Sequence, residues 1–216
     1  MLPKVITLAT SKGGAGKSTL VRSIACHFLQ SGFKVAVIDA DPQGSVIKRN
    51  TQEGILKNLH LVAEPEESVS EVIEELKKDY YPIIVDTGGF RNRTTIKALI
   101  NSDLAIIPLK PSADDLTAAV ETYSLISELN QTSERLGNPI LYRMILTMSQ
   151  YGTIISRHIR SELESMGYFV LNSEMFLRVA YPEAAIKGLS PCITEPDGAA
   201  ARDIAAIMTE ISNLKL

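Results

Sequence analysis

The sequence has few of the residues and patterns that mark several common classes of protein. Tryptophan is absent, aromatic residues make up 6% of the 216 positions, and cysteine occurs twice. Cys26 and Cys192 lie far apart, without the close spacing of a zinc site or a disulfide framework, and we expect Cys26 to be a small buried apolar residue. No apolar run reaches the roughly 18 residues of a membrane span, and the first residues do not resemble a signal peptide. We therefore expect a cytoplasmic protein that does not enter a membrane.

An excess of positive charge is also missing. The 22 lysines and arginines are outnumbered by 25 acidic residues, which leaves a net charge of −3. This balance excludes a polycation that binds nucleic acid through bulk charge. Any DNA binding must therefore come from a local group of basic residues.

Short runs rich in valine and isoleucine alternate with segments of helical period. The runs predict strands at 5–9, 35–38, 83–85, 104–108 and 140–146. The helical segments are 17–31, 70–78, 94–101, 113–130, 153–166 and 199–214. Strands that are apolar on both faces and alternate with helices indicate a parallel sheet covered on both sides. We predict one α/β domain over residues 1–216, a three-layer sandwich around a mostly parallel, twisted sheet.

Two local signals predict helix boundaries. Gly32 follows the first helical segment and suits its C-terminal end. The string from Ser68 to Glu71 has the spacing of a capping box, which would begin the second helical segment.

The segment Thr10–Thr19, with the sequence TSKGGAGKST, follows the first predicted strand and leads into the first helix. Gly13, Gly14 and Gly16 allow positive φ, so backbone N–H groups can converge on an anion. The helix that opens at Lys17 adds its N-terminal partial charge at the same point.

The residues at the helix start extend this interpretation. Lys17 can reach the β- and γ-phosphates of a nucleotide, and the Ser18 hydroxyl can ligate Mg²⁺. Ser11 stands where the usual pattern has its first glycine, so the loop is a variant form. We predict a nucleoside triphosphate site; the alternative is a flexible glycine turn followed by a chance lysine. The expected nucleotide-binding residues of the loop are Lys12, Gly13, Gly14, Ala15, Gly16, Lys17, Ser18 and Thr19.

With Lys12 included, the loop resembles the deviant Walker A box KGGxGK[ST] of the ParA/MinD family of ATPases. The resemblance implies a P-loop NTPase fold of the SIMIBI type, with ATP and Mg²⁺ as ligands and a low intrinsic rate of ATP hydrolysis. It also implies that Lys12 crosses a dimer interface to contact phosphates bound by the other subunit. The alternative for Lys12 is an ordinary surface lysine.

Asp39 and Asp41 follow the second predicted strand and, two positions apart, point to the same side. The string DADPQ is similar to the first switch of the ParA family. By that match Asp41 orients or activates the attacking water, and Asp39 supports Mg²⁺ through a water. An ordinary turn is the alternative.

Asp86 ends the apolar run at 83–85, as the acidic residue of a Walker B element does, and we expect it to ligate Mg²⁺ beside Ser18. Gly88 and Gly89 would let the backbone approach the γ-phosphate and move when it leaves. This glycine pair makes the chain most similar to small, ParF-like partition ATPases.

Thr147 and Met148 lie where the family lines the pocket for the adenine base. The alternative is an ordinary strand end with methionine in the core. The segment 184–196 would cover the base from the other side.

The resemblance implies that ATP forms a sandwich dimer that binds DNA nonspecifically and associates with the nucleoid. A ParB-like centromere-binding protein or a cargo adaptor would then stimulate hydrolysis, giving plasmid or cargo partition. Our candidate DNA contacts, each of which is otherwise an ordinary solvated charge, are Arg157, Arg160, Arg178, Lys187 and Arg202.

Two alternative functions share this nucleotide site. A MinD-like positioning ATPase needs a basic amphipathic helix that binds membranes, and the C-terminal segment has few cations. A small-molecule ATP-dependent ligase of the same superfamily is disfavoured by Lys12 and by the Asp-Pro-Gln string.

Overall fold

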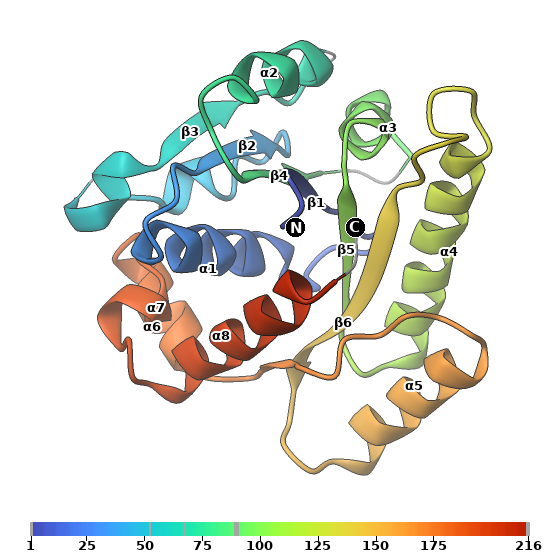
Figure 1. Cartoon of the computed structure of the whole chain (residues 1–216). Helices are drawn as coiled ribbons and strands as arrows, with labels where there is room; N and C mark the ends of the chain where they lie inside the picture. Colours follow the sequence, from blue (N-terminus) through green and yellow to red (C-terminus); the bar gives the residue numbers. More distant parts are fainter. Residues whose placement is uncertain (1, 52, 67, 89–90, 215–216) are drawn as a thin grey trace.

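The computed structural model describes residues 2–51, 53–66, 68–88 and 91–214, and these form a seven-stranded sheet flanked by helices (Figure 1). The strand order is β3-β2-β4-β1-β5-β6-β7, and every ladder between neighbouring strands is parallel. The strands are β1 (Val5–Leu8), β2 (Ala36–Ala40), β3 (His60–Ala63), β4 (Ile83–Thr87), β5 (Leu104–Leu109), β6 (Leu141–Ser149) and β7 (Met175–Phe176).

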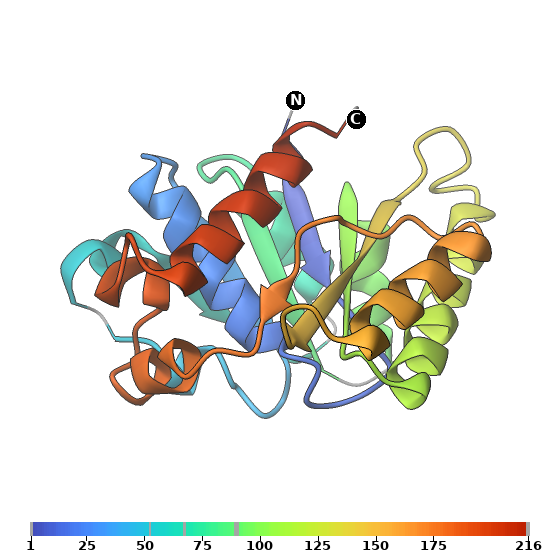
Figure 2. The ribbon, with the colours of Figure 1, turned by 90° about the horizontal axis from the view of Figure 1, so that it is seen from below.

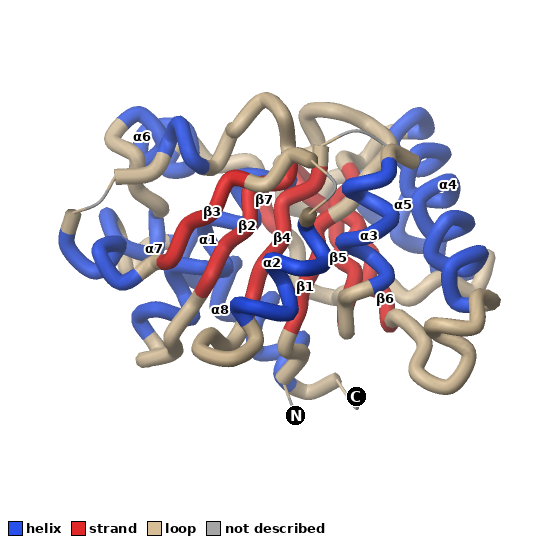
Figure 3. The backbone as a smooth tube through the Cα atoms, turned by 90° about the horizontal axis from the view of Figure 1, so that it is seen from above, coloured by secondary structure: helices blue, strands red, loops and turns tan. Residues whose placement is uncertain are grey.

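Helices lie on both faces of the sheet (Figure 3). The α-helices are α1 (Lys17–Gln30), α2 (Val69–Leu76), α3 (Arg93–Ile100), α4 (Ala113–Asn130), α5 (Ile154–Ser165), α6 (Ala180–Ile186), α7 (Pro191–Thr194) and α8 (Ala199–Ser212). Two 3-10 turns, Ile47–Arg49 and Gly54–Asn58, follow β2. The predicted three-layer α/β sandwich is confirmed.

Alternate residues of the central strands supply the two cores, as the period of a strand requires. In β5, Leu104 and Ile106 pack with α1, α7 and α8 on one face. Ala105 and Ile107, which alternate with these two residues along the strand, pack with α4 and α5 on the other face. Both faces of these strands are therefore buried, which explains their continuous apolar sequence.

Several elements differ from the sequence-based expectation. The edge strand β3 and the two-residue strand β7 were not predicted, nor were α6 and α7. Helix α2 begins beside Ser68, but the Ser68 side chain makes no capping hydrogen bond, so the predicted capping box is wrong. The prediction for Gly32 is confirmed, because it has φ of +84° directly after Ser31, the C-cap residue of α1.

The order of the strands brings several loops together at one edge of the sheet. Strands β2, β4 and β1 are neighbours in the sheet, so the segments that follow their carboxyl ends lie side by side. Figure 2 shows the loops at this edge together with the start of α1. A crevice beyond the carboxyl ends of parallel strands is where such folds bind ligands.

Candidate functional site

The loop between β1 and α1 has the conformation of an anion cradle. Gly14 and Gly16 have φ of +76° and +80°, a region that favours glycine. Gly13 does not use the freedom of a glycine in this way. Gly16 is the N-cap of α1 and supplies no side-chain cap, which leaves the first N–H groups of the helix available to a ligand.

Side chains outside the loop hold it at both ends. The Ser11 backbone N–H donates to Thr122 Oγ1 at 3.0 Å, and Ser11 Oγ donates to the Ala118 carbonyl at 3.1 Å. At the other end, Thr147 Oγ1 donates to the Ala15 carbonyl at 2.8 Å. The serine that replaces the usual first glycine therefore anchors the loop to α4, a role that the sequence reasoning missed.

Lys12 is bound within its own chain. Its Nζ lies 2.8 Å from Asp115 Oδ2 and 3.5 Å from Asp114 Oδ2, at the start of α4. Burial opposes ionisation of Asp115, but hydrogen bonds from Lys12 and Ser112 outweigh it and lower the pKa of this carboxyl. The Lys12 side chain is still 36% exposed, so it is an ion-paired residue on the rim of the loop rather than a free surface lysine.

Asp86 has the burial and the charge expected of a metal ligand. Both carboxylate oxygens are buried, and neither has a hydrogen-bond partner among the described residues. Burial raises the pKa of Asp86 to about 6, and the nearby Lys17 ammonium acts in the opposite direction. A divalent cation would compensate this buried charge, and the oxygen donors of Ser18 and Asp86 suit Mg²⁺. Within the described residues, no group of three or more His, Cys, Asp and Glu side chains is arranged to hold a metal.

Asp39 lies directly beside Asp86, because the two residues are partners in the β2–β4 ladder. Its carboxylate accepts backbone N–H groups of the following loop: Oδ2 from Val46 and Ile47 at 2.9 Å each, and Oδ1 from Asp41 at 3.3 Å. Asp39 therefore shapes the segment that carries Asp41, in addition to the supporting role at the metal that we predicted.

Asp41 and Gly88 bring the loops after β2 and β4 into contact. Asp41 Oδ1 accepts the Gln43 N–H at 2.8 Å, which turns the loop. A Cβ atom added at Gly88 would lie 2.9 Å from Pro42 Cδ and 3.1 Å from both Asp41 Cα and Oδ1. Only glycine permits this approach. Gly89, the other member of the predicted pair, lies outside the described residues.

Two clefts open along these elements. The first, of about 450 Å³, is lined by the phosphate loop together with Asp41, Gln43 and Gly88. The second, of about 260 Å³, has the apolar walls expected for a base: Met148, Met175, Phe176, Tyr181, Pro182 and Ala185. Four residues line both clefts, namely Thr19, Arg22, Arg49 and Met148.

The two residues predicted to line the adenine pocket, Thr147 and Met148, have different positions in the structure. Thr147 is fully buried and uses its hydroxyl on the phosphate loop, so it supports the site from behind. Met148 has φ of +52° and faces the clefts. From the predicted covering segment 184–196, Ala185 lines the second cleft.

Comparison with known proteins agrees with this geometry. The model of the CobQ/CobB/MinD/ParA nucleotide binding domain matches residues 6–192. The chain belongs to this family. It is 28% identical to the protein ParA of Rhizobium radiobacter, over 82% of this chain and 80% of that protein. It is 26% identical to the maintenance of carboxysome distribution protein A of Halothiobacillus neapolitanus, over 96% of this chain and 97% of that protein.

Solved structures of the ParA/MinD type share the fold. An ATP complex of a variant of McdA from Cyanothece has a TM-score of 0.76 at 16% identity and covers 99% of this chain and 98% of its own. The cell division ATPase MinD of Pyrococcus furiosus has a TM-score of 0.77 at 16% identity, covering 98% and 99%. This chain is thus a nucleotide-binding ATPase of the ParA/MinD family. Within the described residues, no helix is both long and apolar enough to span a bilayer.

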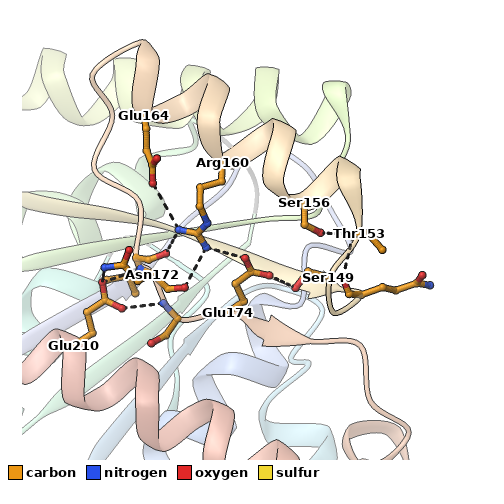
Figure 4. A network of polar contacts seen from close by, with 11 residues as sticks. Ser149, Thr153, Ser156, Arg160, Glu164, Asn172, Glu174 and Glu210 are labelled. Carbon is orange, nitrogen blue, oxygen red and sulfur yellow. Dashed lines mark hydrogen bonds and ion pairs between the residues drawn. The ribbon is translucent and has the colours of Figure 1, made fainter.

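A polar network fixes the end of β6 in this ParA/MinD-type ATPase (Figure 4). Arg160 of α5 donates to Glu174 Oε1 at 2.8 Å, and Ser149 of β6 donates to the other oxygen of Glu174. Arg160 also donates to the carbonyls of Leu171 and Asn172. The network therefore anchors the residue that directly follows Met148.

The five candidate DNA contacts fall into two groups. The Arg160 side chain is 17% exposed and is used in the network just described. Arg178 is ion-paired to Asp203, with Nε 2.6 Å from Oδ2. Because both guanidinium groups are engaged inside the fold, we omit them from the DNA surface proposed below. Arg157, Lys187 and Arg202 are exposed.

Proposed function

We propose that this chain is a partition or positioning ATPase that switches between an ADP-bound single chain and an ATP-bound sandwich dimer. The dimer binds DNA nonspecifically through Arg157, Lys187 and Arg202. A ParB-like or cargo-adaptor partner stimulates hydrolysis and so releases the DNA. In the cell, the ATP-bound form would be associated with the nucleoid.

The position of Lys12 supports this proposal most directly. The residue lies on the exposed rim of the phosphate cleft, and the described structure gives it only acidic partners from α4. A lysine on the rim is accessible to a nucleotide held by a second chain facing this cleft. The relatives named ParA and the maintenance of carboxysome distribution protein are consistent with such a function.

The site geometry suggests how hydrolysis proceeds. Backbone N–H groups at Gly14 and Gly16 and the ammonium of Lys17 would neutralise charge on the β- and γ-phosphates. Mg²⁺, when bound, would stabilise the negative charge of the phosphates, and Ser18 and Asp86 would hold it with support from Asp39. Asp41 would orient the water, and Lys12 of the facing chain would stabilise charge that develops on the γ-phosphate.

Retention of a labelled duplex of arbitrary sequence on a filter tests the proposed function. We expect retention with ATP and Mg²⁺ and little with ADP. The combined variant Arg157→Ala, Lys187→Ala, Arg202→Ala should lose retention while still forming the ATP dimer. Lys57→Ala, which removes an exposed lysine from a 3-10 turn, is a control that should retain DNA.

Other results would favour the alternatives. Equal retention with ATP and ADP would contradict the nucleotide switch. Cosedimentation with liposomes in ATP but not ADP would favour a MinD-like positioning ATPase. ATP turnover stimulated by a small acid, but unaffected by DNA and protein partners, would favour a ligase.

A further inference from the structure

Two arginines lie where the phosphate cleft meets the apolar cleft. Arg22 is on α1, one helical turn beyond Ser18, and Arg49 ends the 3-10 turn after β2. Both line both clefts. Arg22 is only 6% exposed, whereas Arg49 is exposed to solvent. The junction of the clefts therefore has a buried and an exposed cation side by side.

Among the described residues, no acidic side chain forms an ion pair with either arginine. Arg22 Nη1 donates to the backbone carbonyl of Arg49 at 3.4 Å, which holds the second arginine near the first. Arg22 Nε is buried and has no hydrogen-bond partner there. Burial lowers the pKa of Arg22 and the charge of Arg49 acts in the same direction, while the carboxylate of Asp86, which makes no ion pair with Arg22, opposes both.

An arginine here is costly for folding alone. Its neighbours Leu20, Val21 and Ile24 on α1 are fully buried, so an apolar residue would pack at position 22 without desolvating a charge. A buried cation without a counter-charge is destabilising, and two adjacent cations add to the cost. An anion bound between them would offset both effects.

We propose that Arg22 and Arg49 form an anion-binding pair for the α-phosphate of the bound nucleotide. The loop with Lys17 holds the outer phosphates in the first cleft, and the apolar second cleft holds the base. The α-phosphate connects these two parts of the molecule, so it lies at the junction. The inference rests on nucleotide binding, as the proposed function does, but not on dimerisation or on DNA.

The pair has a distinct consequence for affinity. ATP and ADP share the α-phosphate, so contacts to it strengthen the binding of both by the same factor. Lys12 and the residues around the γ-phosphate distinguish the two nucleotides, whereas the arginine pair does not. Removing a guanidinium should therefore weaken both nucleotides and leave their affinity ratio unchanged.

Isothermal titration calorimetry of the full chain with Mg²⁺ tests this, using ADP and the slowly hydrolysed analogue AMPPNP. Arg49→Ala and Arg22→Met should each raise Kd for both ligands by about tenfold, the loss expected for a charge-assisted contact. Lys57→Ala, which removes an exposed cation that lines neither cleft, is the control and should leave both affinities unchanged. Because Arg49 is exposed, its variant keeps the test valid if Arg22→Met fails to fold.

The outcomes separate this inference from the proposed function. Unchanged affinities in both variants would overturn the arginine pair while leaving the proposed function intact. A loss restricted to AMPPNP would show contact with the γ-phosphate and would also overturn it. A wild-type chain that binds neither nucleotide would overturn both proposals. A wild-type chain that retains DNA equally with ATP and ADP would contradict the proposed function alone.

Discussion

Lys12 of the phosphate loop is held by Asp115 at the start of α4, with 2.8 Å between Nζ and Oδ2. Asp115 itself is nearly fully buried and also accepts a hydrogen bond from Ser112 Oγ. If Lys12 contacts a nucleotide on a facing chain, it must leave this partner. The ion pair and the dimer contact are therefore in competition.

The first prediction concerns this competition. Asp115→Asn should release Lys12 and lower the ATP concentration needed for half-maximal dimerisation, about two- to fivefold, as a partly exposed ion pair allows. Asp114→Asn is the matched control, because Asp114 is farther from Lys12, at 3.5 Å, and its side chain is 87% exposed. Lys12→Gln should abolish dimerisation but leave ADP binding unchanged. Light scattering after gel filtration measures dimerisation of the three variants, and calorimetric titration measures ADP binding by Lys12→Gln. A Lys12→Gln chain that still dimerises would contradict the role of Lys12.

The second prediction concerns Asp41. Asp41→Asn keeps an oxygen that accepts the Gln43 N–H but removes the charge that would orient the water. We expect phosphate release to fall about a hundredfold or more, with the ATP dimer retained and longer lived. Phosphate release and gel filtration in ATP measure the two effects. Unchanged turnover would exclude Asp41 from the hydrolytic step.

The position of these acidic residues follows from the sequence for a physical reason. Asp39, Asp41 and Asp86 come directly after apolar runs that cannot avoid the sheet core, and parallel strands end at one edge. The central strands and most long helices were predictable on the same basis. Strand β3 was not, because its residues are exposed or half-buried at the sheet edge and lack the apolar run. Strand β7 has only two residues and carries too little pattern.

The contacts that tune the site depend on residues far apart in the chain. Asp115 reaches Lys12 and Thr122 reaches Ser11 only because α4 packs beside the loop. Arg22 lies off the apolar stripe of α1, two positions from both Leu20 and Ile24, so the sequence indicates a solvated residue, whereas the structure buries it. Periodicity does not encode such pairs, since they arise from the packing of complete elements.

The third prediction concerns the stability cost of Asp86. Burial raises its pKa to about 6, so the folded chain holds this proton more tightly than the unfolded chain. The folded state therefore loses stability as the pH rises from the unfolded pKa through 6. Without nucleotide or Mg²⁺, Asp86→Asn should stabilise the chain by about 3 kcal/mol at pH 7.5 and by less than about 1 kcal/mol at pH 4.

Denaturant unfolding at the two pH values measures this difference. Asp79→Asn, which removes an exposed carboxylate, is the control and should change the free energy of unfolding by less than about 0.5 kcal/mol. Equal stabilisation of Asp86→Asn at both pH values would show that its carboxylate is not destabilising the folded chain. The variant should also lose Mg²⁺-dependent hydrolysis, since its amide replaces the expected ligand.

The fourth prediction concerns the contact between the loops after β2 and β4. In Gly88→Ala the new methyl group would lie within 3.1 Å of Asp41 Cα and closer still to Pro42 Cδ, so the loop that carries Asp41 must move. Because displacement of a water-orienting group by about 1 Å can cost a hundredfold in rate, we expect hydrolysis to fall by at least about tenfold. ADP affinity should change little, since the phosphate loop and Lys17 are untouched. Gly137→Ala is the matched control: its added Cβ meets no atom within 4 Å, so hydrolysis should stay at the wild-type rate. If Gly88→Ala hydrolyses ATP as fast as that control, the approach of the two loops is not required for the reaction.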